Sequence, residues 1–290
     1  PARASLSPRA FRSSSCEIDY IGDPFTLLSS EALIAHANRL KSADVAQTYW
    51  IYINTEKLPM NSAKIRKALS CVLDRKALTQ HLFIGQIPHK SPVCKALSLL
   101  TEKQMYQDAD LATGIKLFDE GLQELGLSRE TCPPLVLSHS DIANQKNFAE
   151  TVQQVWQNAF GISVKIEGSD WSTFSSSLNA RQFQLGGCVR RALYKDPYAQ
   201  LEVFKEKDYS QNSSSWDHST YKRLLTLATK AKDEKERKEY LEEAEKILLD
   251  EMPVIPIFAN TYQYMTSDKF DKFIIDKSGY VDFKKVVFKK

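Results

Sequence analysis

The 290-residue sequence has little net charge, few cysteines and no long hydrophobic run. Its 39 basic and 36 acidic residues give a formal charge of +3, so no strong attraction to nucleic acid is expected. No apolar stretch approaches the roughly 18 residues that span a bilayer. The five cysteines lack CxxC spacing. This argues against a zinc site or a disulfide scaffold and favours unpaired thiols, with one long-range disulfide left open.

The motifs of common enzyme classes are also missing. The sequence has no G-x-S-x-G elbow, no H-E-x-x-H pair, no Walker-type loop and no dinucleotide fingerprint. The run Ser138-His-Ser-Asp141 contains the residue types of a hydrolytic triad, but sequence neighbours do not normally assemble one. We interpret the run as a strand-to-helix junction with Asp141 as the helix N-cap. The sequence therefore predicts no catalytic activity, no metal and no cofactor.

Apolar patterning indicates alternating strands and helices. Trp50 and Tyr52 alternate with Ile51 and Ile53, which predicts a strand over 49–54 that is buried on both faces. The other expected elements are helices over 31–40, 63–75, 115–125, 148–159, 221–230 and 236–249, and strands over 16–22, 135–138, 161–166 and 252–258. The order in the middle of the chain is typical of βαβ units and predicts a largely parallel sheet covered by helices.

Several segments resemble the solute-binding proteins that supply peptide ABC importers. The strand Thr48-Tyr-Trp-Ile-Tyr-Ile-Asn54 and a helix ending in Leu73-Asp-Arg75 are similar to the hallmark segment of that family. The run from Gln153 to Val164 resembles its Q-x-x-W-x-x-x-G-I-x-V pattern, and Met252-Pro-Val-Ile-Pro-Ile-Phe258 resembles its late proline-rich strand. The resemblance covers 16–290, while full family members are about twice as long.

This resemblance implies a periplasmic-binding-protein-like α/β fold of class C, type II. The chain would comprise one ligand-binding lobe and the returning strands of the other lobe. Residues 1–15 are expected to form a flexible lead without the apolar core of a signal peptide. Residues 16–47 would be a remnant of the lobe that carries the termini, 48–250 the ligand-binding α/β lobe, and 251–290 the strands that return to the first lobe.

The resemblance also implies a binding site. The segments 169–174 and 182–197 are similar to the family region in which a strand end offers backbone N–H and C=O groups to an extended peptide. Carried over position by position, the implied ligand-binding residues are Trp171, Gly186, Gly187, Cys188, Val189, Arg190, Arg191, Leu193, Tyr194 and Asp196. Gln47 and Arg191 stand at the positions of two cysteines that some family members carry. Both cysteines are absent from this sequence, as expected if the two once formed a disulfide bridge.

Two departures from the family pattern change the expected specificity. Leu193 stands where the family has the aspartate that pairs with the α-amine of the ligand, so recognition of the ligand amino-terminus is expected to be altered or lost. Arg190 replaces a tryptophan. Together with Arg191 it would favour a carboxylate, an acidic peptide or another anion, unless both side chains point to water. Alternatively, recognition of the amino-terminus is kept, because a shift of the loop by one or two residues brings Asp196 into the amine-binding role.

The function implied by the resemblance is binding without chemistry. The chain would bind peptides or peptide-like solutes and deliver them to the membrane subunits of an ABC importer, acting as a monomer in the periplasm or cell envelope. The alternative is a degenerate binding lobe that contacts a partner macromolecule at the surface.

Overall fold

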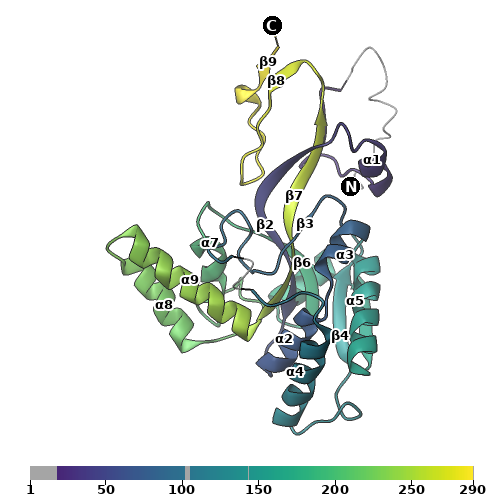
Figure 1. Ribbon diagram of the computed structural model, residues 1–290, viewed down its shortest axis with the longest axis vertical. Helices are drawn as coiled ribbons and strands as arrows, with labels where there is room; N and C mark the ends of the chain where they lie inside the picture. Colours follow the sequence, from purple (N-terminus) through teal and green to yellow (C-terminus); the bar gives the residue numbers. More distant parts are fainter. Residues whose placement is uncertain (1–17, 102–104, 143, 290) are drawn as a thin grey trace.

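The computed structural model describes residues 18–101, 105–142 and 144–289. A mixed sheet of seven strands forms the centre of the molecule, in the order β1-β7-β2-β6-β4-β5 with β3 beside β7 (Figure 1). Its strands are β1 (Tyr20–Gly22), β2 (Lys41–Ile53), β3 (Ile87–Pro88), β4 (Leu135–Ser140), β5 (Val164–Ser169), β6 (Leu185–Arg191) and β7 (Val254–Thr266). A separate two-stranded sheet pairs β8 (Phe270–Lys272) with β9 (Val287–Phe288).

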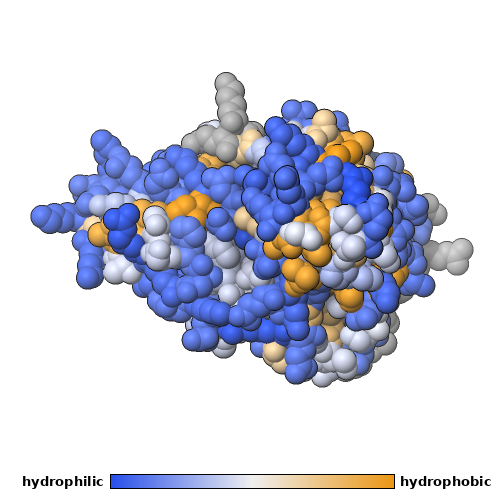
Figure 2. Space-filling view, turned by 90° about the horizontal axis from the view of Figure 1, so that it is seen from below, coloured by the Kyte–Doolittle hydropathy of each residue, from blue (hydrophilic) through white to orange (hydrophobic). Residues whose placement is uncertain are grey.

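Helices cover both faces of the large sheet. They are α1 (Ser30–Ala35), α2 (Ala63–Cys71), α3 (Arg75–His81), α4 (Leu111–Glu124), α5 (Gln145–Phe160), α6 (Trp171–Asn179), α7 (Tyr198–Leu201), α8 (Ser219–Lys230) and α9 (Glu234–Glu251). Helices α2, α4 and α5 contribute to the core on one face, and α6, α8 and α9 to the core on the other. Seen from below, the surface is mostly hydrophilic, and its hydrophobic residues gather in limited areas (Figure 2).

Strand β2 has large side chains on both faces, as the alternation in the sequence predicts. Tyr49, Ile51 and Ile53 belong to the core under α2, α4 and α5, whereas Trp50 and Tyr52 belong to the core under α6, α8 and α9. All five side chains are buried. Burial of a large apolar side chain contributes about 1.5–3 kcal/mol, so β2 holds both helical layers on one sheet.

The expectation of a largely parallel sheet is wrong for the half that contains β1, β2, β3 and β7. Among the described strands, parallel pairing occurs only between β4 and its neighbours β5 and β6, where a helix joins each strand to the next. Strand β2 is antiparallel to both β6 and β7, and β7 is also antiparallel to β1 and β3. A crossover helix fixes the direction only of the strands that it joins. Helices α7 to α9 join β6 to β7, and these two strands run in the same direction, but β2 lies between them and is antiparallel to both.

The long strands β2 and β7 connect the α/β body to a smaller end of the molecule. This end carries β1, α1 and the β8–β9 sheet (Figure 1). Strand β2 starts at Lys41, eight residues before the expected 49, because its first half pairs with the outer half of β7 and has mixed polar character. The expected boundary between residues 47 and 48 therefore falls inside one continuous strand, at a register shift between Asp44 and Thr48.

Two further predictions concern caps and thiols. Asp141 is not the N-cap of α5, because its N–H still donates to the carbonyl of Ser169 and Asn144 takes the cap position. The four described cysteines (Cys71, Cys94, Cys132 and Cys188) are free thiols, while Cys16 lies outside the described residues. No helix in the described part of the chain is long and apolar enough to cross a membrane.

Candidate ligand-binding site

Strand β6 has an edge that is unpaired over most of its length. On one side it pairs with β2 from Leu185 to Arg191. On the other side it pairs with β4 only at Leu185 and Gly186, while β4 continues alongside β5 as far as Ser140. No other strand of the described residues pairs with 187–191 on that side. Beyond Gly186 the sheet is therefore open between β4 and β6.

The hydrogen bonds at the two ends of β6 show which residues face the open edge. The N–H of Asn54 donates to the carbonyl of Gln184 (2.9 Å), and the N–H of Ala192 donates to the carbonyl of Ala46 (2.8 Å). In an antiparallel ladder the residues that exchange hydrogen bonds alternate. The even-numbered residues of β6 therefore face β2. The odd-numbered residues face the other side, where the parallel pairing of Ser138 with Gly186 uses the N–H of Gly187. The groups directed to the open edge are therefore the carbonyl of Gly187 and the N–H and C=O groups of Val189 and Arg191.

This edge lies where the direction of winding reverses. Helix α5 follows β4 and packs on the face of Tyr49, whereas α8 and α9 follow β6 and pack on the face of Trp50. The carboxyl ends of β4 and β6 thus separate toward helices on opposite faces. In α/β sheets such a switch point is where ligands bind. Each face has a hollow here, and Val189 borders both.

The first hollow, of about 330 Å³, lies on the face of α6 and is bordered by both arginines of β6, of which Arg190 has its side chain on this face. We call it the arginine hollow. Six of the ten predicted site residues line it: Trp171, Cys188, Val189, Arg190, Arg191 and Leu193. The Trp171 side chain is 46% exposed at the first turn of α6, where the carboxylate of Asp170 caps the helix. The structure thus brings together the segments at 171 and at 188–193, which the sequence resemblance joined.

Gly186 and Gly187 support the site without lining either hollow. A Cβ on Gly187 would lie 2.1 Å from the hydroxyl oxygen of Tyr49, and a Cβ on Gly186 would lie 3.0 Å from Cδ2 of Leu178. The Tyr49 hydroxyl donates a hydrogen bond to the side-chain oxygen of Gln145 at the start of α5. The absence of a side chain at Gly187 therefore leaves room for a bond that holds β2 to α5 beside the open edge.

The arginines of the hollow have neutral partners. Arg190 donates through Nη2 to the side-chain oxygen of Gln211, and its buried Nε has no hydrogen-bond partner in the described structure. Arg191 donates through Nη2 to the hydroxyl of Tyr262 at 3.4 Å. It also pairs with Gln47 across the β2–β6 ladder. The two positions that the resemblance matched to cysteines are therefore adjacent.

The thiol of Cys188 is protonated at neutral pH. Burial raises its pKa to about 11, against the lowering influence of the Arg190 guanidinium. Burial also raises the pKa of the Tyr52 phenol, which lines the same hollow. A thiol with so high a pKa is a poor nucleophile, so the hollow offers hydrogen bonds and charge rather than covalent chemistry.

Tyr194 and Asp196 lie outside both hollows. The hydroxyl of Tyr194 donates to Glu202 at 2.9 Å. The Asp196 carboxylate accepts hydrogen bonds from Arg237 of α9 at 2.9 Å and from the N–H of Tyr198 at 2.8 Å. Its charge is therefore already paired. Leu193, in contrast, borders the arginine hollow and is 63% exposed.

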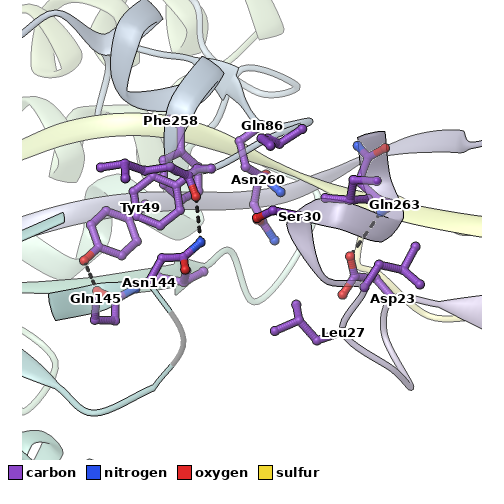
Figure 3. A pocket seen from close by; sticks show the side chains of 16 residues that line it. Asp23, Leu27, Ser30, Tyr49, Gln86, Asn144, Gln145, Phe258, Asn260 and Gln263 are labelled. Carbon is purple, nitrogen blue, oxygen red and sulfur yellow. Dashed lines mark hydrogen bonds between the residues drawn. The ribbon is translucent and has the colours of Figure 1, made fainter. Parts of the chain in front are cut away.

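The second hollow, of about 210 Å³, was not predicted apart from Val189. We call it the tyrosine hollow, because Tyr49 lies on its wall beside Phe258 and Gln145 (Figure 3). Asn144 donates through Nδ2 to the carbonyl of Leu82 at 2.8 Å, which ties α5 to the end of α3. The smaller end of the molecule contributes Asp23, Leu27 and Ser30. One signal in the sequence could have indicated this hollow. Asn144 and Gln145 follow a strand of the parallel part of the sheet, and ligands bind at the carboxyl ends of such strands.

Comparison with known proteins identifies the family. The family of bacterial extracellular solute-binding proteins, family 5 Middle, matches residues 9–212. The oligopeptide-binding protein OppA of Bacillus subtilis (strain 168) is 29% identical over 279 residues, which are 94% of this chain and 51% of that protein. The periplasmic murein peptide-binding protein MppA of Escherichia coli (strain K12) is 27% identical over 221 residues, 74% of this chain and 40% of MppA. The chain thus spans about half the length of the curated relatives it matches.

Solved structures agree on the fold. Haemophilus influenzae OppA, in complex with the peptide RPPGFSPFR, superposes with a TM-score of 0.76 at 20% identity, over 94% of this chain and 54% of that one. The substrate-binding domain of an oligopeptide ABC transporter from Bacillus anthracis superposes with a TM-score of 0.78 at 20% identity, over 94% of this chain and 55% of that chain. These matches confirm the expected α/β fold of periplasmic-binding-protein type II. This chain contains part of that fold, since it covers about half of each matched structure. The chain belongs to the bacterial extracellular solute-binding proteins of family 5.

Proposed function

We propose that this chain binds extended peptides or peptide-like solutes by adding them as a strand to the open edge of β6. The observation that carries the proposal is the set of backbone groups formed by the carbonyl of Gly187 and the N–H and C=O groups of Val189 and Arg191, which alternation directs to the open edge. Main-chain pairing of this kind tolerates varied ligand sequences, because it uses groups that every peptide has. The names of relatives such as the oligopeptide-binding protein OppA support the same class of ligand.

Recognition of a free amino-terminus is altered or lost in this proposal. No side chain that lines the arginine hollow is acidic. Leu193 replaces the carboxylate that the family resemblance implies, and Asp196 is bound to Arg237. An ammonium group in this hollow would face the Arg190 guanidinium without a counter-charge. The ligand is therefore held by its backbone and side chains.

We further infer the division of the chain into a termini-bearing remnant (16–47), a ligand-binding lobe (48–250) and return strands (251–290). The tyrosine hollow supports a role for both parts in binding, since Asp23 and Ser30 come from the remnant and Gln145 and Val189 from the lobe. In this proposal the chain is a non-catalytic monomer of the periplasm or cell envelope. It hands its ligand to the membrane subunits of an ABC importer.

The alternative function is contact with another macromolecule at the surface. It is favoured by large apolar side chains on the smaller end, where Phe25, Tyr280, Phe283 and Phe288 are each more than half exposed. Clusters of exposed aromatic residues are enriched at protein interfaces. This function would use the smaller end and would not need the open edge of β6.

A proline at position 189 tests the proposed function. Val189→Pro removes an N–H that faces the open edge, but it removes no hydrogen bond to β2, and proline is tolerated in strands at such positions. The control Val189→Ala keeps the N–H. The ligand is the capped peptide acetyl-Ala-Gln-Val-Gln-Ala-amide, and its affinity is measured by isothermal titration calorimetry with the full chain.

We expect the proline variant to bind this peptide at least about tenfold more weakly, which corresponds to one lost backbone contact. The alanine variant should stay within about threefold of the parent, and thermal unfolding should show both variants folded. Equal affinity of the folded proline variant and the parent would contradict strand addition at this edge. Absence of binding by the parent would contradict the proposed function itself.

A further inference from the structure

The arginines of the arginine hollow differ from the others that pack into the body. Arg66, Arg75, Arg129, Arg181 and Arg237 each have a carboxylate oxygen within 4.0 Å. Among the described residues, the hydrogen-bond partners of Arg190 and Arg191 are an amide and a phenol. The two side chains point to opposite faces of β6, because they are consecutive in the strand. Arg191 is exposed on the face of Tyr49, so Arg190 supplies the positive charge of the arginine hollow, and the described residues leave that charge without a carboxylate.

Arg190 also has an unused donor. Its Nε is buried and has no partner in the described structure, although Nη2 of the same guanidinium is bound to Gln211. A buried donor without an acceptor costs about 1–3 kcal/mol. A guanidinium held in place at one nitrogen and unpaired at another suits a planar carboxylate, which accepts two parallel hydrogen bonds.

The two hollows lie on opposite faces of the sheet and share Val189 at the open edge. Successive side chains of a strand point to opposite faces. A peptide paired with β6 therefore directs one side chain toward the arginine hollow and the next toward the tyrosine hollow. The tyrosine hollow is lined beside Val189 by Tyr49, Gln145 and Phe258, which suit a neutral side chain.

We propose that the preferred ligand carries an acidic side chain that occupies the arginine hollow, next to a neutral residue that occupies the tyrosine hollow. This inference rests on the proposed function, because strand addition is what fixes the alternation. The preferred ligands are acidic peptides that have either one acidic residue or two acidic residues at positions i and i+2. Arg190 is the specificity-determining residue.

Peptides of matched length test the charge and the spacing. The neutral peptide acetyl-Ala-Gln-Val-Gln-Ala-amide is compared with acetyl-Ala-Glu-Val-Glu-Ala-amide, in which both acids lie on one face. The third peptide, acetyl-Ala-Val-Glu-Glu-Ala-amide, has the same composition as the second but places its acids on opposite faces. A fourth is the neutral peptide with a free carboxyl-terminus, which supplies a carboxylate without an acidic side chain.

Calorimetry with the full chain should show the second peptide binding about tenfold more tightly than the neutral one. Added salt should reduce this preference, because exposed charges are screened. The third peptide should bind more weakly than the second. Equal affinity for glutamate and glutamine peptides would overturn the inference and leave strand addition intact. A gain from the free carboxyl-terminus as large as that from glutamate would also overturn it, since a terminal carboxylate would then be the recognised group.

Arginine substitutions test which side chain causes the preference for glutamate. Arg190→Gln should remove most of the preference for glutamate, measured as the ratio of the affinities for the glutamate and glutamine peptides, and Arg190→Lys should keep part of the preference because it keeps the charge. Arg223→Gln is the matched control, since Arg223 is exposed on α8, lies outside the hollow and carries the same charge. Arg191→Gln, on the opposite face of β6, should keep most of the preference. If Arg190→Gln unfolds at a lower temperature, the reduced preference of Arg190→Lys is the second test. A preference unchanged in both Arg190 variants would overturn the assignment.

Discussion

Arg75 and Arg190 show two different uses of the same side chain. Arg75 is fully buried, and every nitrogen of its guanidinium has a partner. It forms an ion pair with Asp108, and Nε donates to the carbonyl of Pro256 at 2.7 Å. Nη2 donates to the hydroxyl of Tyr106 at 2.8 Å. This network is complete within the protein and joins α3 to β7.

Arg190 is half-buried beside the open edge of β6, and its network is incomplete. It has an amide partner, an unpaired Nε and, among the described residues, no carboxylate. The difference indicates that a paired arginine stabilises the fold, whereas an arginine without its counter-charge is available for a ligand. The predictions below test this distinction, beginning with the largest expected effect.

Loss of the counter-charge at Arg75 should be severe. Asp108→Ala leaves a buried guanidinium without its carboxylate, and breaking a buried ion pair from one side is strongly destabilising. We expect the free energy of unfolding to fall by about 3 kcal/mol in urea denaturation. The control Asp119→Ala removes the carboxylate of Arg129, a half-exposed pair, and should cost about 1 kcal/mol or less. Equal costs would contradict the distinction between the two kinds of site.

Glu245 extends the comparison to a buried anion with neutral partners. Its carboxylate accepts hydrogen bonds from Ser91, Ser98 and the N–H of Leu99, and burial raises its pKa. The folded state therefore keeps this proton to higher pH than the unfolded chain does. The resulting stabilisation is complete below the ordinary pKa of glutamate and declines as pH rises through the raised value.

The pH effect is measured as a difference between two proteins. We expect the free energy of unfolding of the parent, minus that of Glu245→Gln, to decrease from about pH 4 to about pH 8. The subtraction cancels carboxylates such as Asp170 and Glu56, whose lowered pKa values act in the opposite direction. A difference that is flat or rises with pH would show that the burial of Glu245 does not control its titration.

The smallest effect on stability is expected at Arg190. Arg190→Gln removes the unpaired buried Nε but also the hydrogen bond to Gln211, and these two effects on stability oppose each other. The free energy of unfolding should therefore change by about 0.5 kcal/mol or less. Urea denaturation alongside Asp108→Ala gives the direct comparison. A cost near that of Asp108→Ala would assign Arg190 to the fold rather than to the ligand.

The parts of the fold that follow from local pattern could be predicted. The alternation in 49–54 identified a strand buried on both faces, and 3.6-residue periodicity located α2, α4, α5, α8 and α9. The antiparallel placement of β2 and β7 could not be predicted in this way, because pairing between distant strands leaves no local pattern. Strand β2 also pairs through a first half, Lys41 to Gln47, whose polar residues resemble a loop.

The candidate site likewise has one part that could be predicted from the sequence and one part that could not. Trp171 and 188–193 lie in two nearby segments, and their resemblance to a family motif was enough to bring them together. The tyrosine hollow draws on 23–30, 144–145 and 258–263, which meet only through the tertiary fold. Asp196 illustrates the same limit, because its partner Arg237 lies 41 residues further along the chain.

Hydrogen exchange of the β6 amides tests the central claim most directly. In the free protein, the amides of Cys188 and Arg190 should exchange slowly, since they face β2, and those of Val189 and Arg191 should exchange fast. Saturation with acetyl-Ala-Glu-Val-Glu-Ala-amide should slow the second set and leave the first unchanged, because only the open edge gains hydrogen bonds. Fast exchange of the Val189 and Arg191 amides in the presence of saturating peptide would contradict the account.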